Sequence, residues 1–455
     1  MTQTQTIAII ALLLISVVGG YFLLQPKPSP SPSPSPSPSP SPSPSPTVSE
    51  IKVGAVYPLS GAVTRRVIRD SIEFYFETEI NAVGGIESLG GAKVTVVWGD
   101  SQAKADIAMA ETERLITQEG CVMIFGGWWS SLTYAIQEVC QRYKVPNVCV
   151  SSSSPTLLER DYEYFFMAWP HDDYFAMKEV DFLIEELERQ GISDKVKTVG
   201  VFVESALFGQ TARSSWIKYI DKANDEGRVD WEIIMDITFP APVTDVTSEV
   251  LKLKQADPDL VFLCPMSPAD CVKVMTVMIE QDYYPPIAMT MDAGFAMWDF
   301  WQIEEMRKGC KFFYSRFGAG MLEDQIVVVP KLNALYDEWN SEFDYWDNGA
   351  FAYYVAAIVA KDALELAGQN DPGMEDFTEA LKDALYEISI PQERIGLYGV
   401  DFDEETGYNN LIEIIIGQNR DDPDTPGDVI WRTVWPYNLA VEESIIPDPR
   451  SRGLD

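Results

Sequence analysis

The stretch VMIFGGWWSSLT, residues 122–133, decides how this chain folds. Its first four residues are apolar and predict a short buried β-strand, which Gly126 and Gly127 bring to an end. Ser130 and Thr133 then mark a helix start, because their hydroxyls accept hydrogen bonds from free backbone N–H groups. The stretch is therefore a strand, a turn and a helix start, which together form the repeating unit of an α/β sheet.

The same unit recurs on both sides of this stretch. Apolar residues at helical spacing, such as Ile68, Ile72, Phe76 and Ile80, alternate with short β-branched runs. Such alternation predicts parallel sheets that are covered by helices on both faces. The series runs in two halves that meet near Pro170, so we expect two doubly wound α/β lobes. The predicted strands are 51–57, 94–98, 122–125, 148–150, 198–203, 231–238, 260–263 and 287–291, with further β segments within 399–435.

The N-terminal residues have a different composition. The apolar run 7–24 has the length that crosses a bilayer, roughly 27 Å at helical rise, and we expect a transmembrane anchor; a cleaved signal peptide is the alternative. The Pro-Ser alternation of residues 28–46 predicts a semi-rigid polyproline II spacer, or a stalk with O-linked sugars. Both interpretations place this segment outside the cytoplasm.

Composition excludes several classes of function. The chain has 34 basic and 70 acidic residues, a formal net charge of -36, which repels the phosphates of nucleic acids. Six cysteines without CxxC spacing and a single histidine, His171, predict no metal and no cofactor, and buried thiols or one or two disulfides. Without a GxSxG nucleophile elbow or a second histidine, we expect a protein that is not an enzyme.

Two hydroxyl-rich loops follow neighbouring predicted strands. One is the loop 126–133 and the other is Ser151–Pro155. Ligands bind beyond the carboxyl ends of strands in open α/β sheets, and these loops together favour a carboxylate pocket, although each alone is typical of helix capping. In the second half, Asp292 follows a strand and predicts either a ligand for an ammonium group or the N-cap of a helix near 296–301.

A longer series of motifs contains these loops. In chain order they are VGAVYPLSG (53–61), EINAVGGI (79–86), GDSQAKA (99–105), the loop 126–133, SSSSPTL (151–157), FGQ (208–210), ADPDLVFL (256–263), the stretch 350–366 and GVDFDEETG (399–407). The series resembles the type 1 periplasmic binding proteins of branched-chain amino acid transporters, the leucine/isoleucine/valine-binding class.

The resemblance implies two lobes that are joined by three crossovers and close on an amino acid. It implies that Ser130, Ser151 and Ser153 hold the ligand carboxylate and that Asp292 holds its ammonium group, while Phe208 and Met266 pack on the ligand. The expected division is an anchor or signal (1–25), a linker (26–49), lobe 1 (50–168 and 318–400), lobe 2 (169–317 and 401–445) and a tail (446–455).

The chain departs from the family pattern near the ligand. Asp292 stands where the family has glutamate, and Phe208 lacks the hydroxyl of the usual tyrosine. Trp129 is bulky, and Arg65 and Arg66 lie near the usual side-chain pocket. A cationic pocket would select an acidic or polar ligand; the alternative is that both arginines are solvated at an exposed helix start.

The resulting functional hypothesis is an extracytoplasmic solute-binding protein, tethered to the cell membrane by its N-terminal helix. It captures an amino acid or a similar small zwitterion between its lobes and delivers it to the permease of an ABC transporter. The alternative is a ligand-sensing ectodomain that acts with a separate signalling partner.

Overall fold

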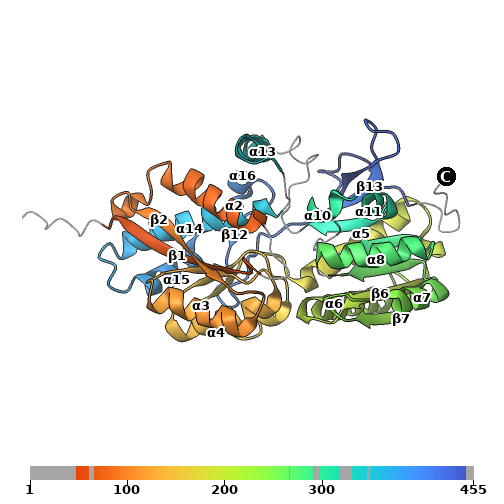
Figure 1. The fold of residues 1–455 in the computed structure, drawn as a ribbon, viewed down its shortest axis with the longest axis horizontal. Coiled ribbons are helices and arrows are strands. Elements are labelled where there is room, and N and C mark those ends of the chain that lie inside the picture. The colour runs from red at the N-terminus through yellow and green to blue at the C-terminus, as the bar shows by residue number, and fades with distance from the viewer. Residues whose placement is uncertain are drawn as a thin grey trace, which may run out of the picture. The chain divides into compact units, whose positions relative to one another are not determined.

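A computed structural model of the chain describes residues 48–60, 66–265, 267–290, 295, 298–317, 330–345 and 349–446. Two large sheets contain most of the strands, and helices pack on both faces of each sheet. The α/β architecture predicted from the alternation of strands and helices is therefore present (Figure 1).

The first sheet has five parallel strands in the order β2-β1-β3-β4-β5. Side chains of β1 alternate between its faces, as the geometry of a strand requires. Val53 and Tyr57 join the core that includes residues of α2 and α14, whereas Val56 packs with residues of α3 and α4 on the other face. The elements are β1 (Glu50–Tyr57), α2 (Arg66–Phe76), β2 (Lys93–Asp100), α3 (Ala105–Thr117), β3 (Ile124–Gly126), α4 (Ser130–Tyr143), β4 (Asn147–Cys149), β5 (Phe165–Met167), α14 (Ala350–Asn370) and α15 (Phe377–Glu387).

The second sheet has seven strands in the order β14-β13-β10-β9-β8-β6-β7. Strands β6 to β10 are parallel, and β13 and β14 extend the sheet in antiparallel register. Helices α5 and α6 cover one face, and α7 and α8 cover the other. The elements are α5 (Asp172–Arg189), β6 (Thr198–Glu204), α6 (Leu207–Asp225), β7 (Glu232–Phe239), α7 (Thr247–Ala256), β8 (Leu260–Cys264), α8 (Pro268–Glu280), β9 (Ile287–Thr290), α10 (Trp298–Trp301), α11 (Glu304–Gly309), β10 (Tyr314–Phe317), β13 (Ile415–Asp421) and β14 (Val429–Trp435).

The chain passes between the two sheets three times. It leaves the first sheet after β5, returns after β10 to supply α14 and α15, and crosses again between β12 and β13. Before the last passage, Met167 at the end of β5 donates its amide to the carbonyl of Gly407 at 2.8 Å. The remaining elements are α13 (Pro330–Glu342), β11 (Ser389–Ile390), α16 (Gln392–Ile395) and β12 (Val400–Asp401). The three passages agree with the expected crossovers, while the exact lobe boundaries stay a prediction.

The expected fold class included a transmembrane helix, and this part of the prediction is wrong for the residues that the structure describes. No helix within the described ranges is long and apolar enough to cross a bilayer. The run 7–24, to which that helix was assigned, lies outside those ranges, as does the Pro-Ser segment 28–46.

All six cysteines are buried, and none of them is joined in a disulfide. Burial raises the pKa of Cys140 and Cys264 above the usual value for a thiol, so these side chains stay protonated and unreactive at neutral pH. Of the two alternatives, buried thiols are therefore confirmed and the disulfides are not.

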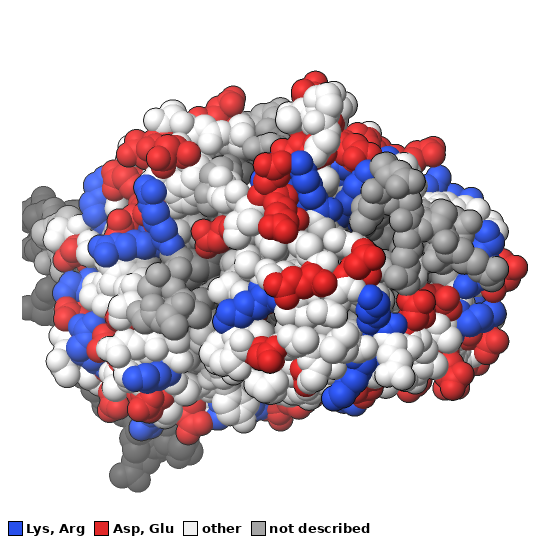
Figure 2. Space-filling view, turned by 45° about the vertical axis from the view of Figure 1, so that its right-hand side comes forward, with Lys and Arg blue, Asp and Glu red and all other residues white. Residues whose placement is uncertain are grey.

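Charged side chains of both signs are mixed over the face of the molecule in Figure 2. Some of the basic groups are held by two carboxylates at once: Arg114 lies 2.8 Å from Glu111 and 3.1 Å from Glu119. Basic side chains therefore neutralise some of the acidic side chains locally, and the acidic side chains on this face do not form a single patch.

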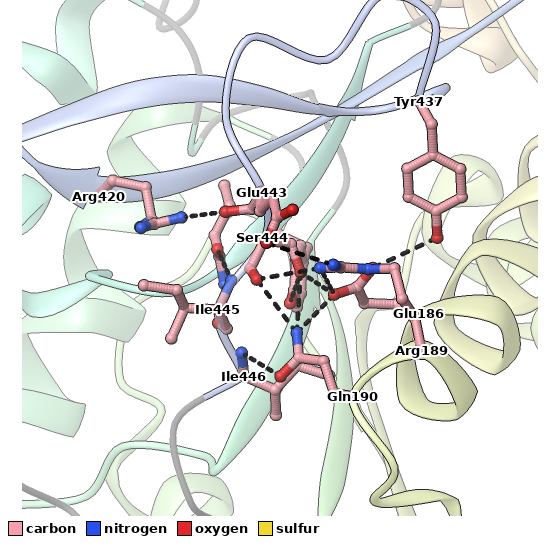
Figure 3. A network of polar contacts seen from close by, with 11 residues as sticks. Glu186, Arg189, Gln190, Arg420, Tyr437, Glu443, Ser444, Ile445 and Ile446 are labelled. Carbon is pink, nitrogen blue, oxygen red and sulfur yellow. Dashed lines mark hydrogen bonds and ion pairs between the residues drawn. The ribbon is translucent and has the colours of Figure 1, made fainter.

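A polar network fixes the C-terminal residues 443–446 to the end of α5 (Figure 3). The buried Glu186 carboxylate accepts hydrogen bonds from Ser444 Oγ at 2.6 Å and from the Arg189 guanidinium at 2.8 Å, and from the amide of Gln190. Burial alone would raise the pKa of Glu186, but these hydrogen bonds outweigh burial and lower it. An ionised carboxylate is therefore the centre of this contact.

Replacing Glu186 with glutamine is expected to lower the free energy of unfolding at pH 7 by about 2 kcal/mol, because hydrogen bonds to a charged group are lost. A carboxyl group with a lowered pKa stabilises the fold above its ordinary pKa of 4.5, and this contribution disappears as the pH falls. Urea denaturation at pH 7 and pH 3.5 should show the difference between wild type and variant shrinking in acid. A difference that is unchanged in acid would contradict this account, and the exposed Glu188→Gln is the control.

Candidate functional site

The carboxyl edge of the first sheet brings three loops together, because β1, β3 and β4 are parallel neighbours. Two hydrogen bonds tie the predicted hydroxyl-rich loops to one another. The amide of Ser154 donates to Ser130 Oγ at 3.3 Å, and Thr133 Oγ1 lies 2.6 Å from Ser152 Oγ. The loops that the sequence predicted to meet are therefore interlocked.

Gly127 gives the first loop its shape. Its φ is +100°, a conformation that L side chains rarely adopt, and its amide donates to the carbonyl of Val56 at 3.0 Å. A Cβ on this residue would lie 2.7 Å from the backbone nitrogen of Thr133 and would overlap the Thr133 hydroxyl. Glycine is required here because the strand end and the start of α4 approach each other too closely for a side chain.

The three predicted serines lie on these loops, with different surroundings. Ser130 begins α4 and is buried, and because its oxygen accepts from Ser154 its own proton is available to a ligand. Ser151 has a buried hydroxyl that interacts with the hydroxyl of Tyr57 and makes no hydrogen bond of ordinary geometry to the part of the chain that the structure describes. Ser153 is buried, and its carbonyl accepts from the amide of Asp172 at 2.7 Å. Ser130 and Ser151 are thus the hydroxyls best placed to bind an acceptor.

Tyr57 is a further candidate that was quoted within a motif but not singled out from the sequence. It ends β1 at the same sheet edge, it is fully buried, and its hydroxyl interacts with the hydroxyl of Ser151 but has no hydrogen bond of ordinary geometry within the described ranges. Burial raises the pKa of Tyr57 well above its usual value, so the phenol keeps its proton as a donor. Its position as the last residue of a buried strand is the signal that would have identified it.

Phe208 lies in the second half of the chain, in the first turn of α6, where it is half-buried. Glu204, at the end of β6, fixes this turn: its carboxylate accepts from the amides of Ala206 at 2.5 Å and Gly209 at 2.8 Å. Both oxygens therefore cap the helix, and this strand-end carboxylate is committed to the backbone rather than to a ligand.

The other predicted residues differ in how far the structure supports them. Trp129 packs against the apolar cluster between α3 and α4, and Trp128 packs against the central core instead. Arg66 is exposed, pairs with Asp70 at 2.8 Å and with Asp344 at 3.7 Å, and stacks on the ring of Tyr345. These ion pairs favour the alternative of a solvated arginine over a cationic pocket.

Asp292 and Met266, the predicted second-lobe contacts, lie outside the described residues, as does Arg65. Within the ranges that are described, no group of three or more His, Cys, Asp or Glu side chains is arranged to hold a metal ion. The described site is therefore a set of neutral hydroxyl donors at a sheet edge and a helix N-terminus. Such a set can bind a carboxylate, and it contains no nucleophile paired with a base.

Comparisons with known proteins agree with this arrangement. A family model described as periplasmic binding protein matches residues 50–407. "Leu/Ile/Val-binding protein homolog 7" of Brucella abortus (strain 2308) is 24% identical over 407 residues, which cover 88% of this chain and 94% of the relative.

Solved structures share the fold at low sequence identity. A solute-binding protein of an ABC transporter from Rhodopseudomonas palustris BisB5, in complex with 3,4-dihydroxybenzoic acid, has a TM-score of 0.67 at 15% identity and covers 84% of this chain and 95% of its own. A leucine-binding protein from Thermotoga maritima MSB8 has a TM-score of 0.64 at 15% identity, covering 84% and 98%. With the family model spanning most of the chain, this protein belongs to the periplasmic binding protein family.

Proposed function

We propose that this protein binds an amino acid or a similar small zwitterion outside the cytoplasm and presents it to the permease of an ABC transporter. The observation that carries the proposal is the interlocked pair of loops at the first sheet edge, where Ser130 and Ser151 offer hydroxyl protons beside the N-terminus of α4. Binding without chemical conversion fits a site built from neutral donors.

The carboxylate end of the ligand is the part that this site explains. Hydrogen bonds to a charged group contribute about 1.5 to 3 kcal/mol each, and the positive end of a helix dipole adds to them. Three or four such bonds reach about -8 kcal/mol, the free energy of a micromolar complex. We assign Ser130, Ser151, Ser153 and Tyr57 to this end, and Asp292 to the ammonium end.

The rest of the ligand is less constrained. The similar solved structures include one in complex with 3,4-dihydroxybenzoic acid and one named as a leucine-binding protein. A carboxylate is the chemical group that these two molecules share. We therefore infer that the hydroxyl-lined loops recognise the carboxylate and that other surfaces select the side chain.

Isothermal titration calorimetry of the protein with L-leucine, L-glutamate and 3,4-dihydroxybenzoate tests this function. We expect saturable one-to-one binding of an amino acid, weakened at least tenfold by Ser130→Ala, because one charge-assisted hydrogen bond is lost. Ser214→Ala is the matched control, since this exposed hydroxyl donates to the carbonyl of Gln210 within α6 at 2.9 Å. Unchanged affinity in the Ser130 variant would overturn the site assignment.

A further inference from the structure

Arg160 joins the segment that follows β4 to helix α4. It lies beyond the loop Ser151–Pro155, and its Nη1 donates to the carbonyl of Tyr134 at 2.7 Å. Its Nη2 donates to the carboxylate of Glu138 at 2.6 Å, and the Arg160 side chain is only 14% exposed. Tyr134 and Glu138 both belong to α4, the helix that begins at Ser130. One arginine therefore connects the two parts of the chain that carry the proposed ligand hydroxyls.

Two tyrosine rings hold the guanidinium of Arg160. Its Cζ lies 4.1 Å from the ring centroid of Tyr134 and 4.3 Å from that of Tyr162. Nη2 also donates to the Tyr162 hydroxyl at 2.5 Å. A planar guanidinium can stack on rings and donate hydrogen bonds within its plane at the same time, whereas an ammonium group cannot. These contacts therefore depend on the shape of the guanidinium and not only on its charge.

Gln137 of α4 adds a further link beside Arg160. This side chain is buried, and in the orientation that satisfies both neighbours its amide donates to the carbonyl of Leu157 at 3.3 Å and accepts from Arg160 Nη1 at 3.3 Å. The start of the same segment is tied to α4 by the hydrogen bond between the two hydroxyl-rich loops. The segment 151–157 is therefore held against α4 at both of its ends.

The contacts of Arg160 differ from those of a second enclosed arginine, Arg316 of β10. Arg316 lies 2.8 Å from Glu179 and 3.8 Å from Asp172, and all three side chains are fully buried. Two buried carboxylates require a counter-charge, so Arg316 neutralises them. Arg160 instead pairs with the carboxylate of Glu138, which is 51% exposed, and its other contacts are rings, a hydroxyl and carbonyl groups. Arg160 therefore contributes mainly the placement of its neighbours.

We propose that Arg160 is a positioning residue for ligand binding: it fixes the segment 151–157 against α4 and so sets the separation of the Ser130 and Ser151 hydroxyls. The inference rests on the proposed function, which assigns both hydroxyls to the ligand carboxylate. Groups that bind one ligand together must keep their relative positions to within about 0.5 Å. Arg160 acts through the loop and the helix, and loosening its contacts moves the two donors apart.

Calorimetry of the full chain with L-leucine, L-glutamate and 3,4-dihydroxybenzoate tests this role. Arg160→Lys keeps a positive charge beside Glu138 but loses the planar fork and the stacking. We expect the dissociation constant of each probe that binds the wild type to rise about tenfold, because one hydroxyl no longer reaches the carboxylate. Glu138→Gln is a milder change to the same contacts and should raise the dissociation constant about threefold, even if Arg160→Lys fails to fold.

Arg142→Met is the matched control, since Arg142 lies at the other end of α4 and also stacks on a tyrosine ring, that of Tyr143 at 5.5 Å. It should bind with wild-type affinity. Hydrogen exchange of the segment 151–157, followed by mass spectrometry without ligand, should be faster in Arg160→Lys than in the wild type or in this control. A residue that only raised overall stability would leave the affinity and this local difference unchanged.

The double variant Ser130→Ala/Arg160→Lys shows whether Arg160 acts through Ser130. We expect its loss of affinity to be smaller than the product of the two single losses, because both changes affect the same contact. Wild-type affinity in Arg160→Lys, or single losses that simply multiply, would overturn the inference and leave the proposed function standing. Absence of wild-type binding to all three probes would overturn both.

Discussion

Replacing Arg316 with methionine is expected to lower the free energy of unfolding by about 3 to 5 kcal/mol, because two buried carboxylates lose their counter-charge. Arg316 lies 2.8 Å from Glu179, and its guanidinium also stacks on the ring of Phe175 at 3.2 Å. Methionine can replace the methylene groups of the Arg316 side chain, but it carries no charge. Urea denaturation at pH 7 measures the loss.

Two variants show whether the buried charge is the cause. Arg213→Met removes an arginine that pairs with Asp236 at a partly exposed site, where an ion pair contributes at most about 1 kcal/mol. The double variant Arg316→Met/Glu179→Gln should recover part of the loss, because one uncompensated carboxylate is also removed. If Arg316→Met lowered the free energy of unfolding by less than about 1 kcal/mol, the ion pair between Arg316 and Glu179 would not be what stabilises these buried charges.

Replacing Gly127 with alanine is expected to cost about 3 kcal/mol and to abolish measurable ligand binding. The cost has two parts, the strain of a positive φ and the overlap of the new Cβ with the backbone of Thr133. Relieving the overlap moves the start of α4 and therefore Ser130 away from Ser154. Urea denaturation and calorimetry with the three probes measure the two effects.

Gly120→Ala separates these two parts. Gly120 also has a positive φ, +75°, but a Cβ there would meet nothing within 4 Å. This control should cost only about 1 kcal/mol and leave binding intact. If the two variants were equally stable and both bound ligand, the close approach of the loop to α4 would not define the site.

Local patterns predicted the larger part of the fold. The predicted strand 122–125 overlaps β3, which begins two residues later and includes Gly126, and the hydroxyl-rich residues after it begin α4, because the periods of strands and helices are visible in neighbouring residues. The meeting of the two serine loops was also predictable, since parallel strands end at one edge of the sheet. The assignment of a membrane helix was wrong for the described ranges, and the lobe boundaries stay a prediction.

Long-range pairing explains what the sequence missed. Nothing near Asp172 in the chain indicates that Arg316, Glu179 and Thr211 surround it, because those contacts form only when α5, α6 and β10 pack together. The same is true of Tyr57, whose hydroxyl became significant only once its burial was known. Arg66 is the opposite case: the sequence suggested it as a pocket residue, and the structure pairs it with the acidic side chain of Asp70.

The sequence by itself determined the α/β class of fold, the order of most of its strands and helices, and the meeting of two hydroxyl-rich loops, but it missed the strands β5 and β10. The tertiary structure decided which hydroxyls can donate a hydrogen bond to a ligand, that none of the six thiols forms a disulfide, and that a buried carboxyl group connects the loop after β4 to the second sheet. The reason is physical. Periodicity is a property of adjacent residues, whereas burial, charge compensation and proton sharing depend on atoms that only folding brings together.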